Sequence, residues 1–499
     1  MKQVLRKRAI YFLLVCSSIF SAQSLYSQVT PEAGAMPPQG TDLVASTSSA
    51  EAKELFNKAL AASDLNEGRK ARKLYTQAIE KDQELGIAYI FRATTATSTK
   101  EFVDDINMGR SKLANASEWE KMYADYLYTN LTGDRDKQMS IAKSMAEKFP
   151  SGRSYVELGQ TYSGNKEYDK AETAFRKAME LNPGWVGGAS ALTGLYLFGE
   201  NKDLAKGKEA AEKVVALAPN SPGAHVVLGD AFRAQNNLEK AAEEYRKAIA
   251  LDPAAAAPYF KLGHTNVYLG KMAEARANFK EAGMRDERKS FSEMLQAYTY
   301  GYDGDTKKMM RSLMETADKY AGLSGDYKSQ QLQFLNAAAT IAVHNGDAST
   351  LKNLITRITP ISKEVMTTVG TPEAMIFHET EMLRWQAMLD IVQGNYAGAQ
   401  EKANSMKMAM EPLKDNRKLE VYHQTLGHMM LKQRQYKEAV EHLKMADQLS
   451  LYNNYLLAKA YEGTGDTDNA MKYYKEIGSN NFNSLDNAIL RYQVKQKLK

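Results

Sequence analysis

A set of small and aromatic residues recurs along this chain at a spacing of about 34 residues. In residues 154–183 the set is Leu158-Gly159, Tyr162, Ala171, Phe175, Ala178 and Pro183. It returns as Leu228-Gly229, Phe232, Ala241, Tyr245, Ala248 and Pro253, and again as Leu262-Gly263, Ala275, Phe279 and Ala282. Such a repeat constrains the fold more than composition does, because it predicts one small unit stacked many times over.

Further copies of the set lie toward both ends of the chain. They are Leu426-Gly427, Tyr436, Ala439, Leu443 and Ala446, then Leu457-Ala458, Tyr461, Ala470 and Tyr474, and a weaker early copy, Ala71, Tyr75 and Ala78. Residues 290–419 lack the set, but their apolar residues still recur at intervals of three and four between breaks that pair Gly with Asp or Asn. That period predicts helices joined by short turns.

Each residue type in the set has a packing explanation. The glycines are expected where the two helices of a hairpin approach closely, because a larger side chain would hold the helices apart. The alanines are the small partners on the second helix, and the aromatic residues fill the gap to the next hairpin. Pro183 and Pro253 then end the second helix before the next hairpin begins. The set is therefore a packing pattern and not a catalytic motif.

This pattern resembles the tetratricopeptide repeat family, whose unit is a helix-turn-helix with these residues at these spacings. The resemblance implies an all-α, right-handed α-solenoid of about twelve hairpins, with the first helix of each hairpin on the concave side. We expect an N-terminal array over residues 51–289, irregular hairpins over 290–419, and further repeats with a capping helix over 420–499. The cations of that capping helix suit a solvated face; they are Arg491, Lys495, Lys497 and Lys499.

Residues 1–28 have the pattern of a secretory signal peptide. Four cations precede the mostly apolar run Ala9–Phe20, which is shorter than the about 20 apolar residues that span a bilayer. The cations supply four of the five net positive charges, so the remainder is close to neutral and gives no electrostatic reason to expect nucleic acid as a partner. After them, residues 29–50 are rich in Pro, Gly, Ser and Thr and predict a flexible linker.

The signal peptide predicts export to the periplasm or cell envelope, with no membrane span in the mature chain. The single cysteine, Cys16, lies inside it. Lipid anchoring through Cys16 is an alternative to plain cleavage, but Val15 stands where a bacterial lipoprotein box has a small residue. A mature chain without cysteine would have no disulfide and no thiolate metal site.

Motifs for catalysis, cofactors and metals are incomplete. The phosphate-loop spacing from Gly194 to Gly199 lacks the Lys and Ser/Thr that should follow, and His378 has no second histidine one turn further on. Met406 and Met410 would share a helix face that Met408 does not, which favours core packing over a copper(I) site. We therefore expect no enzyme, no cofactor and no metal.

The predicted function is a non-catalytic scaffold of the bacterial cell envelope that holds a protein or peptide in its concave groove. The resemblance places the groove on Val156, Gln160, Ser190, Gly194, Val226, Asp230, Phe260 and His264. These positions lack the Lys and Asn clamp that heat-shock chaperone adaptors of the family use, so an extended peptide or a helix fits better than a C-terminal carboxylate. An alternative is that some of these side chains only contact neighbouring repeats.

Two other functions remain open. An outer-membrane nutrient-binding component is one, since starch-utilisation lipoproteins also carry tetratricopeptide-like helices. Such glycan platforms use exposed aromatic faces, and this chain has only three tryptophans, Trp119, Trp185 and Trp385. A lytic enzyme on a helical ring is the other, and it would require a catalytic domain that the sequence does not reveal. The sequence does not specify an oligomeric state.

Overall fold

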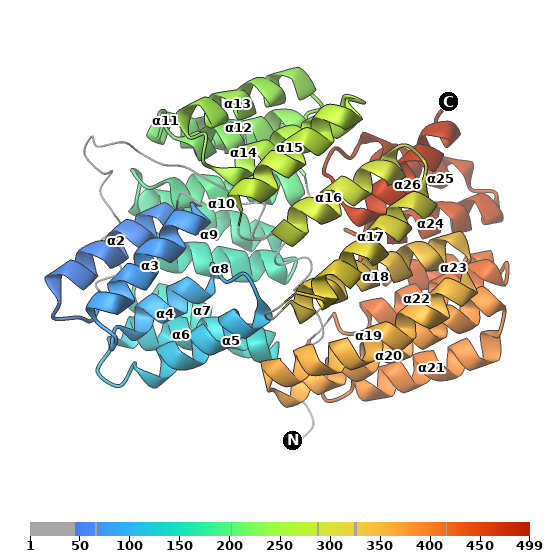
Figure 1. The fold of residues 1–499 in the computed structure, drawn as a ribbon, viewed down its shortest axis with the longest axis horizontal. Coiled ribbons are helices and arrows are strands. Elements are labelled where there is room, and N and C mark those ends of the chain that lie inside the picture. Colours follow the sequence, from blue (N-terminus) through green and yellow to red (C-terminus); the bar gives the residue numbers. More distant parts are fainter. Residues whose placement is uncertain (1–44, 65–66, 201, 287–288, 324–326, 416) are drawn as a thin grey trace. The chain divides into compact units, whose positions relative to one another are not determined.

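The computed structural model describes residues 45–499, except 65–66, 201, 287–288, 324–326 and 416. In this part of the chain the secondary structure consists of 25 helices, α2 to α26, with no strand (Figure 1). The prediction of an all-α chain of helical hairpins is confirmed. The predicted signal peptide and its cysteine, Cys16, lie outside the described residues.

The helices form two compact units that divide between Lys289 and Ser290. The first unit contains α2 (Ala50–Asp64), α3 (Gly68–Lys81), α4 (Gly86–Ala93), α5 (Thr99–Ser111), α6 (Glu118–Thr132), α7 (Arg135–Lys148), α8 (Gly152–Gly164), α9 (Tyr168–Leu181), α10 (Val186–Phe198), α11 (Leu204–Leu217), α12 (Pro222–Ala234), α13 (Leu238–Leu251), α14 (Ala256–Tyr268) and α15 (Met272–Arg285).

The second unit contains α16 (Lys289–Tyr302), α17 (Thr306–Ala321), α18 (Lys328–Asn345), α19 (Ala348–Val369), α20 (Pro372–Gln393), α21 (Tyr396–Ala409), α22 (Glu420–Lys432), α23 (Tyr436–Lys444), α24 (Leu451–Thr464), α25 (Thr467–Ser479) and α26 (Leu485–Lys497). In the described residues, α2 to α25 follow one another as twelve helix-turn-helix pairs, and α26 comes after the last pair.

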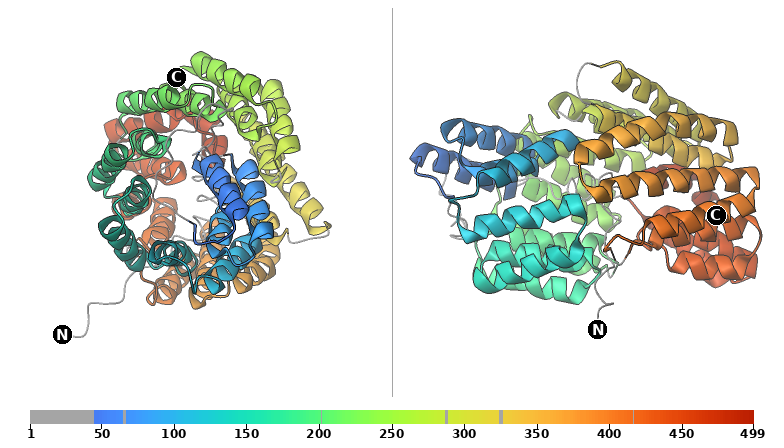
Figure 2. Two further views of the ribbon diagram at one scale, coloured as in Figure 1. Left: turned by 90° about the vertical axis from the view of Figure 1, so that its left-hand side faces the viewer. Right: turned by 90° about the horizontal axis from the view of Figure 1, so that it is seen from below.

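Neighbouring hairpins contact each other through the second helix of one and the first helix of the next, and also through their two first helices. In the first unit α8 contacts α10, α10 contacts α12, and α12 contacts α14; in the second, α20 contacts α22 and α22 contacts α24. The first helices therefore line one side of each stack. In the left view of Figure 2, the blue helices α2 and α3 lie inside the curve that the teal to yellow-green helices α8–α15 of the same unit trace.

Several of the breaks between helices combine a left-handed residue with a capping side chain. Gly346 ends α18 with φ at +70°, a conformation that glycine adopts without steric cost. Asp347 then caps α19, since its carboxylate accepts a hydrogen bond of 3.0 Å from the backbone N–H of Thr350. Gly465 and Asp466 repeat this arrangement between α24 and α25. These pairs are why the chain turns sharply between helices.

The repeated glycines receive a side chain from the second helix of the same hairpin. A Cβ added to Gly229 would lie 2.5 Å from the ring of Tyr245, and one added to Gly159 would collide in the same way with the ring of Phe175. Both rings are buried. The aromatic residue thus fills the space over the glycine of its own hairpin, and this space is what a larger residue would take away.

Some helices of the irregular segment are longer than those of the regular repeats. α19 and α20 have 22 residues each, whereas α8 to α15 have 13 or 14. Even so, none of the described helices combines the length and the apolar character that crossing a bilayer requires. Met406 and Met410 are fully buried with Phe377, while Met408 is 76% exposed. The predicted role of Met406 and Met410 in core packing is confirmed.

The ends of the described chain are both held by side-chain contacts. Ser46, expected in the flexible linker, donates its backbone N–H to Glu120 of α6 at 3.0 Å, so this residue is held by the first unit. At the other end, α26 buries Leu490 and Val494 against α24 and α25. Arg491, expected on a solvated face, is 9% exposed and donates to the carbonyl oxygen of Asn480 at 2.7 Å, which corrects that expectation.

Candidate functional site

Most of the residues predicted to line an open groove are buried. Gln160 is exposed and Ser190 is half-buried, while the buried members of the set are Val156, Gly194, Val226, Asp230, Phe260 and His264. Val226 packs in a core cluster with Ala241 and Tyr245. Val226 therefore contacts neighbouring helices and does not face an open groove, which is the alternative that the sequence left open.

Asp230 belongs to a buried charged network between α12, α13 and α14. Its carboxylate accepts hydrogen bonds from the Tyr245 hydroxyl and from Lys261 Nζ, each at 2.6 Å, and lies 3.2 Å from the Arg233 guanidinium. Burial lowers the pKa of Lys261, and the ion pair with Asp230 opposes that shift. Asp230 therefore binds cations of its own chain, which corrects the expectation that it faces an open groove.

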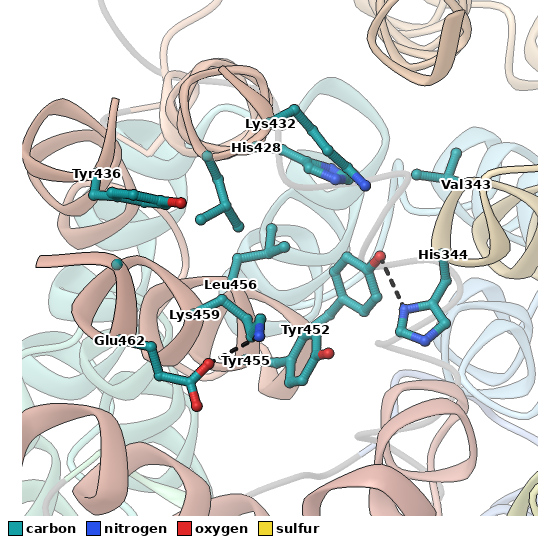
Figure 3. Close-up of a pocket in the computed structure, with 12 residues that line it drawn as sticks. Val343, His344, His428, Lys432, Tyr436, Tyr452, Tyr455, Leu456, Lys459 and Glu462 are labelled. Atoms are coloured by element: carbon teal, nitrogen blue, oxygen red, sulfur yellow. Dashed lines mark hydrogen bonds and ion pairs between the residues drawn. The ribbon is translucent and has the colours of Figure 1, made fainter. Parts of the chain in front are cut away.

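A separate pocket of about 470 Å³ lies in the second unit (Figure 3). Its walls come from α18, α22 and α24, and Tyr436 at the start of α23 adds to them. The polar and aromatic residues of the lining are His344, His428, Lys432, Tyr436, Tyr452, Tyr455, Lys459 and Glu462. Apolar contacts come from Val343, Leu431 and Leu456. The pocket thus combines aromatic faces with both signs of charge.

Hydrogen bonds fix several of these side chains. His344 Nδ1 lies 3.3 Å from the Tyr452 hydroxyl, and the other ring nitrogen lies 2.5 Å from Gln493 Nε2 of α26. Lys459 pairs with Glu462 at 2.8 Å, and Lys497 pairs with the second oxygen of Glu462 at 2.7 Å. His344, Tyr452, Lys459 and Glu462 are therefore positioned by the protein itself before any ligand arrives.

Burial and neighbouring charges determine which side chains of the pocket are charged. Burial lowers the pKa of His428 to about 3 and that of His344 to about 4, and the positive charge of Lys432 adds to both shifts. Both histidines are therefore neutral at pH 7. Burial favours the neutral form of Glu462, but hydrogen bonds from Lys459 and Lys497 outweigh it and lower the pKa of this carboxylate. The exposed Lys432 has no ion-pair partner among the described residues, and it leaves the pocket lining with an uncompensated positive charge.

The repeat pattern contains a signal for this pocket that the predicted groove did not use. His428 follows Gly427 as Asp230 follows Gly229, and Lys459 follows Ala458 in the same position. Carrying the register past His264 into the C-terminal repeats would have pointed to these residues. The contribution of His344 could not have been found in this way, because α18 lies in the segment that lacks the pattern.

The stacked hairpins and the buried glycine–aromatic contacts define a helical repeat protein. Family models described as TPR repeat and tetratricopeptide repeat match residues 229–270, 152–184 and 451–477. These segments of the chain are therefore tetratricopeptide repeats. Repeats of this kind support a role as a protein-interaction scaffold.

Parts of this chain are similar to known proteins. The human protein O-mannosyl-transferase TMTC1 is 30% identical over 161 residues, which cover 31% of this chain and 18% of that protein. A tetratricopeptide repeat protein from Parabacteroides merdae is 17% identical, with 50% of this chain and 99% of that chain covered and a TM-score of 0.36. A thermophilic repeat protein from Thermus thermophilus is 20% identical, with 38% of this chain and 99% of that chain covered and a TM-score of 0.31.

Proposed function

We propose that this protein is a non-catalytic scaffold that holds a segment of a partner protein in the pocket of its C-terminal repeats. The observation that carries the proposal is the pocket itself, in which Lys432 stands beside Tyr452 and Tyr455 on first helices of consecutive hairpins. Peptide binding on first helices uses an existing concavity and requires no chemistry from the protein.

The pocket favours a ligand with a negatively charged group next to an apolar or aromatic one. An acidic group can pair with Lys432, whose positive charge has no counter-ion among the described residues. Tyr452 and Tyr455 offer aromatic surface for the apolar part, and tyrosine supplies such contact area at low cost in side-chain entropy. An acidic side chain flanked by a hydrophobic one on an extended or helical segment meets both requirements.

We place this activity in the bacterial cell envelope, as an exported protein. The support comes from the cationic and apolar pattern of residues 1–28, with lipid anchoring through Cys16 as the alternative form of the same export. The glycan-binding alternative has less support. Trp119 and Trp385 are buried, at 4% and 1% exposure, so these two cannot form an exposed platform.

The test is photocrosslinking from inside the pocket. Tyr455 is replaced by p-benzoylphenylalanine in the exported protein, and crosslinked proteins are identified by mass spectrometry. The matched control carries the same residue at Lys475, which is exposed on α25 of the same unit and lies outside the pocket. We expect a partner that crosslinks from position 455 and not from position 475.

A charge reversal then links the partner to the pocket. Lys432→Glu should remove the crosslink by placing a negative charge against the acidic ligand, whereas Lys475→Glu should leave it unchanged. If the partner crosslinks equally in both variants, or equally from both positions, the pocket is not the binding site.

A further inference from the structure

The first hairpin of the chain makes a buried ion pair on the inner side of the first unit. Asp64, the last residue of α2, lies 2.6 and 2.8 Å from the Arg153 guanidinium at the start of α8. The side chains of Arg153 and Asp64 are only 13% and 15% exposed. The Trp185 indole, just before α10, donates a hydrogen bond of 3.0 Å to the same carboxylate. One acidic side chain thus binds two hairpins that come much later in the sequence.

A second contact holds the other side of the same turn. Arg69, at the start of α3, donates to the carbonyl oxygen of Arg285 at 2.9 Å, and Arg285 donates to the carbonyl oxygen of Pro253 at 2.8 Å. Arg285 is the last residue of α15, and Pro253 lies in the turn after α13. The α2–α3 turn therefore contacts the stack at separate points, in agreement with the position of the blue helices inside the curve of α8–α15 in Figure 2.

We propose that the α2–α3 hairpin is a built-in occupant of the concave face of α8 and α10, and that the ligand of this face is an acidic protein segment that displaces Asp64 from between Arg153 and Trp185. The hairpin then acts as an internal competitor that keeps the face closed until such a segment arrives. This surface lies in the first unit and is separate from the pocket around Lys432.

The side chains around Asp64 indicate the chemistry of the partner, which must bind the Arg153 guanidinium in place of Asp64. The Arg153 guanidinium lies 5.2 Å from the centroid of the Trp185 ring and 5.9 Å from that of Phe91, so it is enclosed by aromatic faces. Glu157 is one helical turn away, and while Asp64 is bound, burial and the Asp64 charge raise the pKa of Glu157 to about 7. A buried guanidinium without a full counter-charge is costly, and a carboxylate from the partner removes that cost.

Competition within one chain explains how the same contact can regulate binding. The tethered hairpin is present at a high effective concentration, so most chains are closed at any time. The apparent affinity for a partner is reduced by the fraction of chains that are open. Weakening the Asp64 contact must therefore tighten the binding of an acidic segment.

The first experiment measures whether the hairpin opens. Asp64→Arg places a cation against Arg153, and Glu54→Arg is the matched control on the exposed side of α2, where Glu54 is 66% exposed. Trp119 and Trp385 are buried, so acrylamide quenching of fluorescence reports mainly on Trp185. We expect quenching to increase in Asp64→Arg and not in Glu54→Arg, and unchanged quenching in Asp64→Arg would overturn the proposal.

The second experiment measures the exchange of occupants in the full chain. The probe is a fluorescent synthetic peptide of residues 45–85 of this chain, which carries the natural Asp64. It should bind Asp64→Arg at least about tenfold more tightly than the natural protein, because the internal competitor is weakened. The same peptide with Asp64→Asn should lose this binding, and so should a protein that also carries Arg153→Gln.

A purely structural role for the contact gives a different result. In that case Asp64→Arg opens the hairpin, but the peptide binds it no better than it binds the natural protein, and the proposal fails. If circular dichroism shows that Asp64→Arg is not folded, Arg69→Ala replaces it, since this variant loosens the turn and leaves the Asp64 site intact. The affinity of the 45–85 peptide for Arg69→Ala is then compared with its affinity for the natural protein, and equal affinities contradict the proposal.

Discussion

Adjacent residues of one repeat have separate packing roles. Gly229 lies beneath the Tyr245 ring, and Asp230 forms ion pairs with Lys261 and Arg233 inside the stack. The sequence pattern predicted the first role, because glycine recurs at that position and an aromatic residue recurs on the following helix. It did not predict the second, because the corresponding residues Gln160, His264 and His428 are not acidic and the cationic partners of Asp230 come from two different helices.

We therefore expect both residues to be needed for stability, for different reasons. Gly229→Leu should lower the free energy of unfolding by about 1–3 kcal/mol or more, since the added side chain collides with the Tyr245 ring. Asp230→Ala should lower it by about 3–5 kcal/mol, since it leaves the buried Lys261 and Arg233 without their carboxylate. Urea denaturation followed by circular dichroism measures both changes, with Glu54→Arg as the exposed control. An Asp230→Ala variant as stable as the natural protein would contradict the role given to the network.

The pocket histidines make a prediction about pH. The folded-state pKa values, about 3 for His428 and about 4 for His344, lie below the value of about 6.5 for an unfolded chain. The contribution of these histidines to stability is therefore present above pH 6.5 and is lost as the pH falls toward 4 and then 3. Each histidine should remove up to about 1.4 kcal/mol per pH unit from the free energy of unfolding.

Denaturation of the natural protein and of His428→Gln at several pH values between 7 and 4 tests this expectation. The charged and titratable groups that face His428 are Lys432, His344 and Tyr452. Of these groups only His344 titrates in that interval, so His428→Gln should lose less stability on acidification than the natural protein. Parallel pH profiles for the two proteins would show that His428 is not the group responsible.

At the scale of helices, the sequence predicted the type and order of the elements. It predicted less well which side chains on those helices are buried by tertiary contacts. Gly346 with Asp347, and Gly465 with Asp466, mark turns in the sequence because their side chains act within the turn itself. The environment of Arg491 depends on α25 and on the turn after it, whose carbonyl oxygens accept from its guanidinium. Arg491 lies in the middle of α26, where a cation is usually solvated, and only the tertiary position of the helix buries it.

The arrangement of hairpins over the whole molecule depends on contacts that repeat patterns do not encode. Stacking of neighbours follows from the local pattern, because each hairpin must bury its apolar face against the next. The contact of Asp64 with Arg153 and Trp185 joins hairpins that are not neighbours, and the residues involved belong to no recurring position. The pattern assigned the predicted groove residues to first helices, but it did not indicate that side chains such as Val226 and Phe260 are buried there.

The division between Lys289 and Ser290 leads to the last prediction. Because hairpins in an array are stabilised mainly by their neighbours, a unit of several hairpins should fold without the rest of the chain. The first unit has seven hairpins and the second has five followed by α26, and both exceed the about three repeats that such arrays need. We expect fragments 45–286 and 289–499 to be helical and to unfold cooperatively when each is produced alone.

Circular dichroism gives the helix content, and hydrogen exchange compares each fragment with the same region of the full chain. A cut between Ala218 and Pro219 is the matched control, because it separates α11 from α12, which contact each other. That cut should raise exchange in the hairpins on both sides of it, whereas the cut at the unit boundary should leave the interior hairpins of each fragment unchanged. Equal damage from the two cuts would mean that the two units do not fold independently.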